Sequence, residues 1–292
     1  MRQTADLVFD AHDQIGESPI WNGRDGSLWW TDIPGARLHR LHLASGDHDT
    51  IATPARVGSL ALRSGGGLVL AMEHAFGLFD PATGTYEEIC APEAGMNGNR
   101  FNDGRCDRRG RFFAGSMYEP RGRELGALWR LDPDRAVHRI ADGVTVANGL
   151  AWSPDDRIMY WADSPTSRIW MFDYDIGTGT PSKRRLWLDG APADHGRPDG
   201  CTIDSEGCYW SARYMGGKVI RYTPSGKVDR IIHLPVPRVT MCAFGGADLK
   251  TLYITTARAD TAELRAAEGP LAGALFAVAT DVSGLPEPDY RG

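Results

Sequence analysis

The stretch NGLAWSPDDRIMYWADS, residues 148–164, is one of six related segments that recur along the chain. It opens with a polar residue and a glycine, continues as a short apolar strand, turns at Pro-Asp-Asp, and ends in a second strand rich in aromatic residues. Two such strands joined by a Pro-Asp or Asp-Gly type of turn are typical of a β-hairpin. More strand-like sequence follows in RIWMFDYDIGTGTPSKRRLWL, residues 168–188. Each segment therefore predicts the start of a small antiparallel sheet.

The period of the repeat indicates the fold. The six segments begin 41 to 51 residues apart, at Glu17, Gly58, Asn102, Asn148, Asp199 and Met241. A period of about 40–50 residues with four short strands is typical of a propeller blade. The sequence thus predicts an all-β protein: a six-bladed β-propeller with four antiparallel strands per blade and a central channel, forming a single domain over residues 1–292.

Two segments outside the repeat also carry predictions. ADLVFDAHDQI, residues 5–15, precedes the first repeat, and we expect it to supply the outer strand of the last blade and so close the ring. The only helix-like stretch is DTAELRAAEG, residues 260–269, which we interpret as an insertion on the rim of the last blade.

Composition and charge exclude several classes of function. The formal net charge is −6 and no basic run occurs, so neither nucleic acid nor a membrane is an expected partner. The start of the chain has no apolar segment of the kind that a secretory signal needs, and no stretch of about 18 apolar residues predicts a membrane span. The five cysteines form no C-x-x-C pair, which favours reduced thiols and a cytoplasmic protein.

Equivalent positions of the repeat form a ring around the axis of a propeller. Four of the six opening residues are polar: Glu17, Asn102, Asn148 and Asp199. Two carboxylates at one mouth of a narrow channel repel each other unless a cation is present. Carboxylate and amide oxygens suit hard divalent ions such as Ca²⁺, Mg²⁺ and Mn²⁺, while Zn²⁺ and Fe²⁺ stay open. We therefore predict that one divalent cation is held by Glu17, Asn148 and Asp199, whose formal charges balance it.

The polar stretch NRFNDGR, residues 99–105, belongs to the same mouth. Arg100 and Asn102 are expected to lie beside the metal and to form hydrogen bonds with substrate hydroxyls or a ring oxygen, since arginine presents a rigid fork of donors. Asp103 is expected to anchor its own loop.

These stretches give the chain a strong resemblance to the regucalcin (senescence marker protein 30) and gluconolactonase family. The matching segments cover nearly the whole chain: GESPIW, NRFNDGR, GRFFAGSM, NGLAWSPD, RPDGCTIDSEGCYW, GGKVIRYTPSGK and CAFGGADLKTLYITTAR. The resemblance implies a six-bladed propeller that binds one divalent cation and hydrolyses sugar lactones. It places the metal ligands on Glu17, Asn148 and Asp199 and the substrate contacts on Arg100 and Asn102.

One departure from the family pattern bears on the substrate. In animal regucalcins a further acidic residue that touches substrate follows the AGTM motif, whereas this chain reads AGSMYEPRG. Glu119 is the nearest acidic residue, and we treat it as a third candidate for substrate binding. The departure leaves open which sugar lactone is preferred.

The reaction predicted is hydrolysis of an aldonolactone, such as gluconolactone or a pentonolactone, to the aldonic acid. Asp199 is the candidate to accept the proton of the attacking water, and no G-x-S-x-G motif suggests a serine hydrolase. The partner is a small sugar lactone, and the chain is expected to be a monomer or a weak homodimer. Two alternatives stay open: a calcium-binding regulatory protein without turnover, and a propeller hydrolase of phosphotriesters or other lactones.

Overall fold

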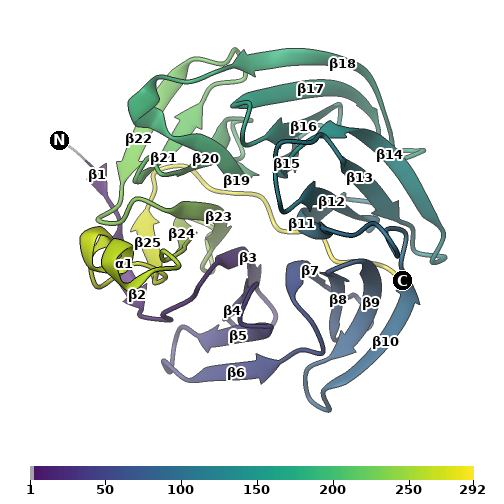
Figure 1. Ribbon diagram of the computed structural model, residues 1–292, viewed down its shortest axis with the longest axis horizontal. Helices are drawn as coiled ribbons and strands as arrows, with labels where there is room; N and C mark the ends of the chain where they lie inside the picture. The colour runs from purple at the N-terminus through teal and green to yellow at the C-terminus, as the bar shows by residue number, and fades with distance from the viewer. Residues whose placement is uncertain (1–2) are drawn as a thin grey trace.

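Six antiparallel sheets are arranged in a ring in the computed structural model, which describes residues 3–292 (Figure 1). The first strand of each repeat lies innermost, and each inner strand contacts those of the two neighbouring blades. All six residues used to set the phase of the repeat fall in these inner strands. The predicted six-bladed β-propeller is therefore confirmed.

The first three blades follow the chain in order, from the innermost strand outward. Their strands are β3 (Gly16–Asn22), β4 (Ser27–Asp32), β5 (Arg37–His42) and β6 (His48–Ala52); β7 (Val57–Leu62), β8 (Leu68–Met72), β9 (Ala75–Asp80) and β10 (Thr85–Cys90); and β11 (Asn99–Cys106), β12 (Phe112–Tyr118), β13 (Gly126–Leu131) and β14 (Val137–Val144).

The last three blades repeat this order, and two of them recruit the N-terminal segment. Their strands are β15 (Ala147–Trp152), β16 (Ile158–Asp163), β17 (Arg168–Asp175) and β18 (Thr180–Asp189); β19 (Arg197–Ile203), β20 (Tyr209–Tyr214), β21 (Lys218–Tyr222), β22 (Val228–His233) and the short β1 (Gln3–Thr4); and β23 (Val239–Gly245), β24 (Thr251–Thr256), β25 (Leu275–Ala279) and β2 (Asp6–Phe9).

Strand β2 completes blade 6 by pairing antiparallel with β25, which confirms that the segment before the first repeat closes the ring. β1 goes further and pairs in parallel with β22 of blade 5. The helix-like stretch forms α1 (Ala262–Glu268), begun by the Thr261 side chain, which accepts a hydrogen bond from the Leu264 amide. A short 3₁₀ helix, Ala193–His195, precedes β19.

The turns between the first two strands of a blade share one chemistry. In blade 5, Asp204 Oδ1 accepts hydrogen bonds from the amides of Glu206 and Cys208, at 2.9 and 3.0 Å. In blade 3, Asp107 Oδ1 accepts from the amides two and four residues on, at 2.9 and 3.0 Å. Such Asx turns explain why an Asp and a Gly recur at this point of the sequence.

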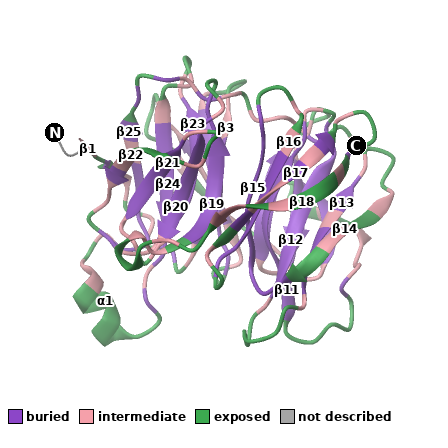
Figure 2. Ribbon diagram, turned by 90° about the horizontal axis from the view of Figure 1, so that it is seen from above, coloured by how far each residue is buried: buried purple, intermediate pink, exposed green. Residues whose placement is uncertain are grey.

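Aromatic side chains fill the space between blades. Trp161 packs with Phe113 and Leu128 of the preceding blade, and Trp210 packs with Phe244 of the following one. Figure 2 shows the inner strands as buried, whereas the outer strands β14 and β18 are partly exposed. Apolar burial between sheets is the main term that holds such a ring together.

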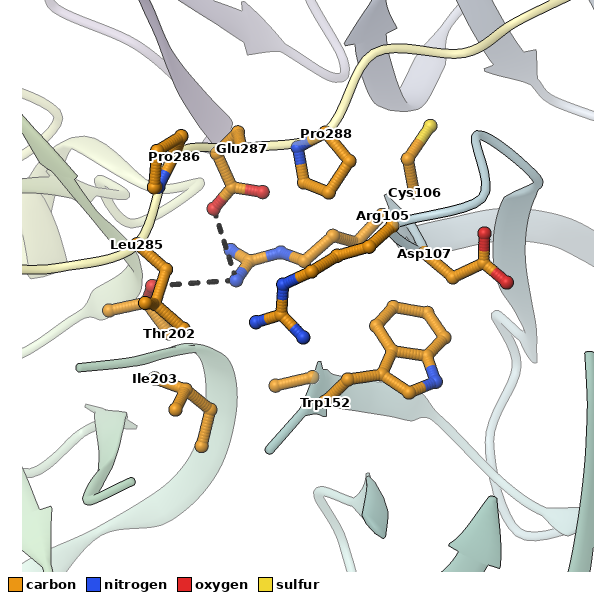
Figure 3. Close-up of a pocket in the computed structure, with 12 residues that line it drawn as sticks. Arg105, Cys106, Asp107, Trp152, Thr202, Ile203, Leu285, Pro286, Glu287 and Pro288 are labelled. Carbon is orange, nitrogen blue, oxygen red and sulfur yellow. Dashed lines mark hydrogen bonds and ion pairs between the residues drawn. The ribbon is translucent and has the colours of Figure 1, made fainter. Parts of the chain in front are cut away.

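The segment after β25 crosses the ring and covers one end of the channel (Figure 1). There Arg105 forms an ion pair with Glu287, Nη1 to Oε1 at 3.2 Å (Figure 3). Arg105 also donates to the Cys201 carbonyl at 2.8 Å. Tyr290 is fully buried and donates its amide to the Leu62 carbonyl, 2.8 Å. The tail thus ties blades 2, 3 and 5 together.

The cysteines and the helices can also be compared with the expectations from the sequence. All five cysteines are free, and four of them are buried. Among residues 3–292, α1 and the 3₁₀ helix are both far too short to cross a bilayer, and no other helix occurs.

Candidate functional site

One pocket gathers the polar residues that open four of the six repeat segments and lie in their inner strands. Glu17, Asn102, Asn148 and Asp199 all line it, and so does Arg100. The other lining residues are Ile15, Met117, Arg121, Val146, Ser164, Arg197, Tyr214 and Thr240. The structure thus places all the predicted metal ligands, and two of the three predicted substrate contacts, around one pocket.

The pocket and the C-terminal tail lie at opposite ends of the same inner strands. In β11, Arg100 lines the pocket and Arg105 contacts the tail. In β19, Asp199 lines the pocket, while Thr202 lies with the tail residues in a second pocket. A strand rises about 3.3 Å per residue, so the two ends are well separated along the axis. The tail therefore leaves the candidate site open.

A β-bulge interrupts each inner strand beside the site. The pairing register shifts between Glu17 and Ile20, between Asn148 and Ala151, and at the matching point of the other four blades. Bulges re-aim side chains and are frequent next to active sites. Gly149 within the second bulge has φ +59°, and a Cβ there would approach Tyr209 Oη to 2.3 Å. This explains the glycine that follows the polar residue in the repeat.

Buried carboxylates dominate the electrostatics of the pocket. Burial, followed by repulsion from Asp199 and Asp103, raises the pKa of Glu17 well above its usual range. Burial and the charge of Asp103 likewise raise the pKa of Asp199. Burial also raises the pKa of Asp103, although the Leu150 amide donates to its Oδ2 at 3.0 Å. The charged forms of these carboxyl groups are therefore disfavoured in this pocket, and a bound cation would stabilise them.

A chain of hydrogen bonds fixes the amide side chains. Arg100 Nη1 donates to Asn102 Oδ1 at 2.8 Å, and Asn102 Nδ2 donates to the Ala147 carbonyl and to Asn148 Oδ1, at 3.0 and 3.1 Å. Asn148 Nδ2 in turn donates to Ser164 Oγ at 2.7 Å. These contacts orient the Asn148 oxygen. Ser164, which sequence reasoning missed, follows a strand as an ordinary Asp-Ser pair and gave no signal of this role.

Glu119 lies outside the set of lining residues and contacts Arg100 instead. Its Oε1 accepts from Arg100 Nε at 2.7 Å and forms an ion pair with Arg56 at 2.9 Å. Burial acts to raise the pKa of Glu119, but the two arginines lower it overall. Arg100 Nη2 has no protein partner among residues 3–292, so this nitrogen remains available to a ligand. Glu119 is thus placed to orient Arg100.

We expect Glu119→Gln to raise KM for the substrate about 10-fold with a smaller change in kcat, because one charge-assisted hydrogen bond that orients Arg100 is weakened. Steady-state kinetics would measure the split. Glu73→Gln is the matched control, since Glu73 pairs with Arg56 and not with Arg100. Equal effects of the two substitutions would contradict an action through Arg100.

The donor set fits a divalent cation. Glu17, Asn148 and Asp199 offer oxygen ligands with a formal charge of −2, and Asp103 Oδ1 beside them is buried without a hydrogen-bond partner. Within residues 3–292 no three His, Cys, Asp or Glu side chains gather in a metal-binding arrangement, and the predicted set combines two carboxylates with one amide. The ligand set remains a prediction.

Comparison with known proteins identifies the family and agrees with the fold. The sequence pattern described as "SMP-30/Gluconolactonase/LRE-like region" matches residues 15–258. The chain is 40% identical to 6-deoxy-6-sulfogluconolactonase of Pseudomonas putida over the full length of both, and 38% identical to regucalcin of Danio rerio over 98% of both. The solved structure of a calcium-binding protein, regucalcin, from Agrobacterium tumefaciens superimposes with a TM-score of 0.93 at 29% identity, covering 100% of each chain.

The fold and the site define the class of protein first: a six-bladed propeller with a polar pocket at one end of its channel. The chain belongs to the SMP-30/gluconolactonase/LRE-like family.

Proposed function

We propose that this lactonase hydrolyses a sugar lactone to the open aldonic acid with the help of one divalent cation held by Glu17, Asn148 and Asp199. The observation that carries the proposal is the pairing, in one pocket, of buried carboxylates with the partly unpartnered guanidinium of Arg100. The names of its relatives point to ring opening of sugar lactones and to binding of calcium.

The residues around the pocket have different roles in the proposed hydrolysis. A bound divalent cation would supply Lewis acidity toward the lactone carbonyl and lower the pKa of a coordinated water. Asp199, with two carboxylate oxygens, takes the proton of the attacking water. Arg100 donates its free Nη2 to a hydroxyl or ring oxygen of the sugar and so holds the ring in a reactive orientation. Asn102, whose amide hydrogens are engaged by Ala147 and Asn148, keeps Arg100 and Asn148 in place.

A turnover enzyme is favoured over a purely calcium-binding protein by one feature of the pocket. Arg100 is buried and held by Glu119 and Asn102, yet one guanidinium nitrogen is unused. Burying an arginine is costly unless its donors are satisfied. A structural ion alone would give this nitrogen no role, whereas a hydroxylated ligand gives it one.

Removing the metal is expected to lower lactonase activity at least about 100-fold, because several kcal/mol of charge stabilisation are lost. Acid release should be followed for a panel of aldonolactones with chelator-treated protein, and again after adding Ca²⁺, Mg²⁺, Mn²⁺, Zn²⁺ or Fe²⁺. Recovery with one or more ions supports the proposal.

Two results would contradict it. Undiminished hydrolysis by protein shown to be free of metal would remove the cation from the reaction. Tight cation binding without turnover of any lactone in the panel would instead identify a calcium-binding protein of the kind that the name regucalcin describes.

A further inference from the structure

Three arginines line the candidate pocket, and they differ in how their charge is balanced. Arg100 is buried and paired with Glu119. Arg121 and Arg197 are exposed at the pocket, and their side chains form no hydrogen bond or ion pair with any residue in the described range 3–292. The site therefore presents two guanidinium groups that the protein itself leaves unpaired.

The two unpaired arginines come from different blades and are held by their backbones. Arg121 follows β12 in a left-handed conformation, φ +64°, and its amide donates to the Tyr118 carbonyl at 3.0 Å. A non-glycine residue with this φ is uncommon and is often found at functional sites. Arg197 is the first residue of β19, two residues before Asp199, and lies opposite Tyr214 in the sheet.

Charge balance in the pocket gives these arginines a function. Glu17 and Asp199 together match a dication, and Glu119 together with Glu73 balances Arg100 and Arg56. With the cation bound, Asp103 is the one carboxylate of the site left over, against the two positive charges of Arg121 and Arg197, and neither arginine forms an ion pair with it. Arg121 and Arg197 line the same pocket as Asp199, so one ligand bound there can contact these arginines and the reaction centre together.

We propose that the substrate is an anionic sugar lactone, and that Arg121 and Arg197 bind its charged group at the end of the sugar away from the lactone carbonyl. Sulfonate, phosphate and carboxylate groups share the arrangement of oxygens that a guanidinium fork recognises. The inference rests on the proposed lactonase function and narrows it, because a neutral lactone would leave both arginines without a partner.

The test compares matched lactones on the metal-loaded enzyme. Glucono-1,5-lactone is set against analogues that carry a sulfonate, a phosphate or a carboxylate at C6, with the spontaneous rate subtracted. We expect kcat/KM for at least one charged lactone to exceed that for the neutral one by about 10-fold or more, the effect of a charge-assisted hydrogen bond. The lactone with the highest value identifies the anionic group.

Substitution of the two arginines tests whether they cause the preference for charged lactones. Arg121→Gln and Arg197→Gln are each expected to lower the ratio of charged to neutral kcat/KM about 10-fold. Arg123→Gln is the control: it removes another exposed arginine of the same loop, one that stacks on Tyr118 at 5.6 Å and does not line the pocket, and it should leave the ratio unchanged.

The outcomes separate this inference from the proposed function. If glucono-1,5-lactone is hydrolysed at least as efficiently as every charged analogue, or if both variants keep the wild-type ratio, the anionic substrate is refuted while the lactonase function stands. If no lactone is hydrolysed, the proposed function itself fails.

Discussion

Replacing Asp199 by Asn is expected to lower kcat/KM for lactone hydrolysis by at least about 1,000-fold, because the change removes both a proton acceptor and an anionic ligand. The side chain keeps its shape, so the pocket should keep its form. Burial and Asp103 already raise the pKa of Asp199, so the neutral amide should also relieve repulsion in the metal-free protein. The measurements are steady-state kinetics at saturating cation and thermal unfolding without cation.

Asp194→Asn is the matched control, because this carboxylate belongs to the same segment but is exposed and forms an ion pair with Lys218 at 3.4 Å. Its kinetics should equal those of the wild type. Activity within about 10-fold of wild type in Asp199→Asn at saturating cation would contradict the role of Asp199 as general base, since such a base contributes about 10²–10⁴-fold.

The largest effect on stability is expected at the other end of the channel, for Glu287→Gln. Its ion pair with Arg105 is largely shielded from water, with side-chain exposures of 10% for Arg105 and 12% for Glu287 (Figure 3). Removing one partner of a buried pair leaves an uncompensated charge, which costs about 3–5 kcal/mol of unfolding free energy. Urea denaturation would measure the loss.

Asp289→Asn provides the comparison for Glu287. It lies two residues further along the tail and pairs with Arg24, whose side chain is 52% exposed, so its loss should cost no more than about 1 kcal/mol. The double change Arg105→Met with Glu287→Leu should recover much of the stability, because it removes both charges. A Glu287→Gln protein as stable as Asp289→Asn would show that the tail contact contributes little.

The ring of blades was predictable because its signal is local and repeated. Each repeat carries its own turn residues, such as the Asp204 of blade 5, and its own alternation of apolar residues, so six independent segments indicate the same unit. Closure by residues 5–15 followed from the need to cover a sheet edge. The parallel pairing of β1 with β22 did not, because two residues carry no periodic pattern. The contact of Arg105 with Glu287 joins positions far apart in the chain and has no local signature either.

The candidate site was predictable only where it follows the phase of the repeat. Glu17, Asn148 and Asp199 occupy equivalent positions, so the sequence alone predicts that they share one end of the channel, and the pocket contains all three. The repeat did not predict a role for Arg121 or Arg197. Arg121 lies in a loop, and Arg197 lies two residues before Asp199, the position that repeats from blade to blade. In a sequence, each resembles an ordinary solvated arginine. The contact of Glu119 with Arg100 could not be predicted either, because the pairing of these side chains depends on the exact path of the loop that carries Glu119.

Blade 6 combines two segments that lie far apart in the polypeptide, since β2 pairs with β25. A ribosome therefore delivers β2 long before its neighbour, so this sheet cannot assemble until β25 has been synthesised. A nascent or prematurely terminated chain that lacks Leu275–Ala279 leaves β2 and the outer side of β24 with unsatisfied backbone groups. Incomplete products of translation should accordingly be the form of this protein that aggregates most readily.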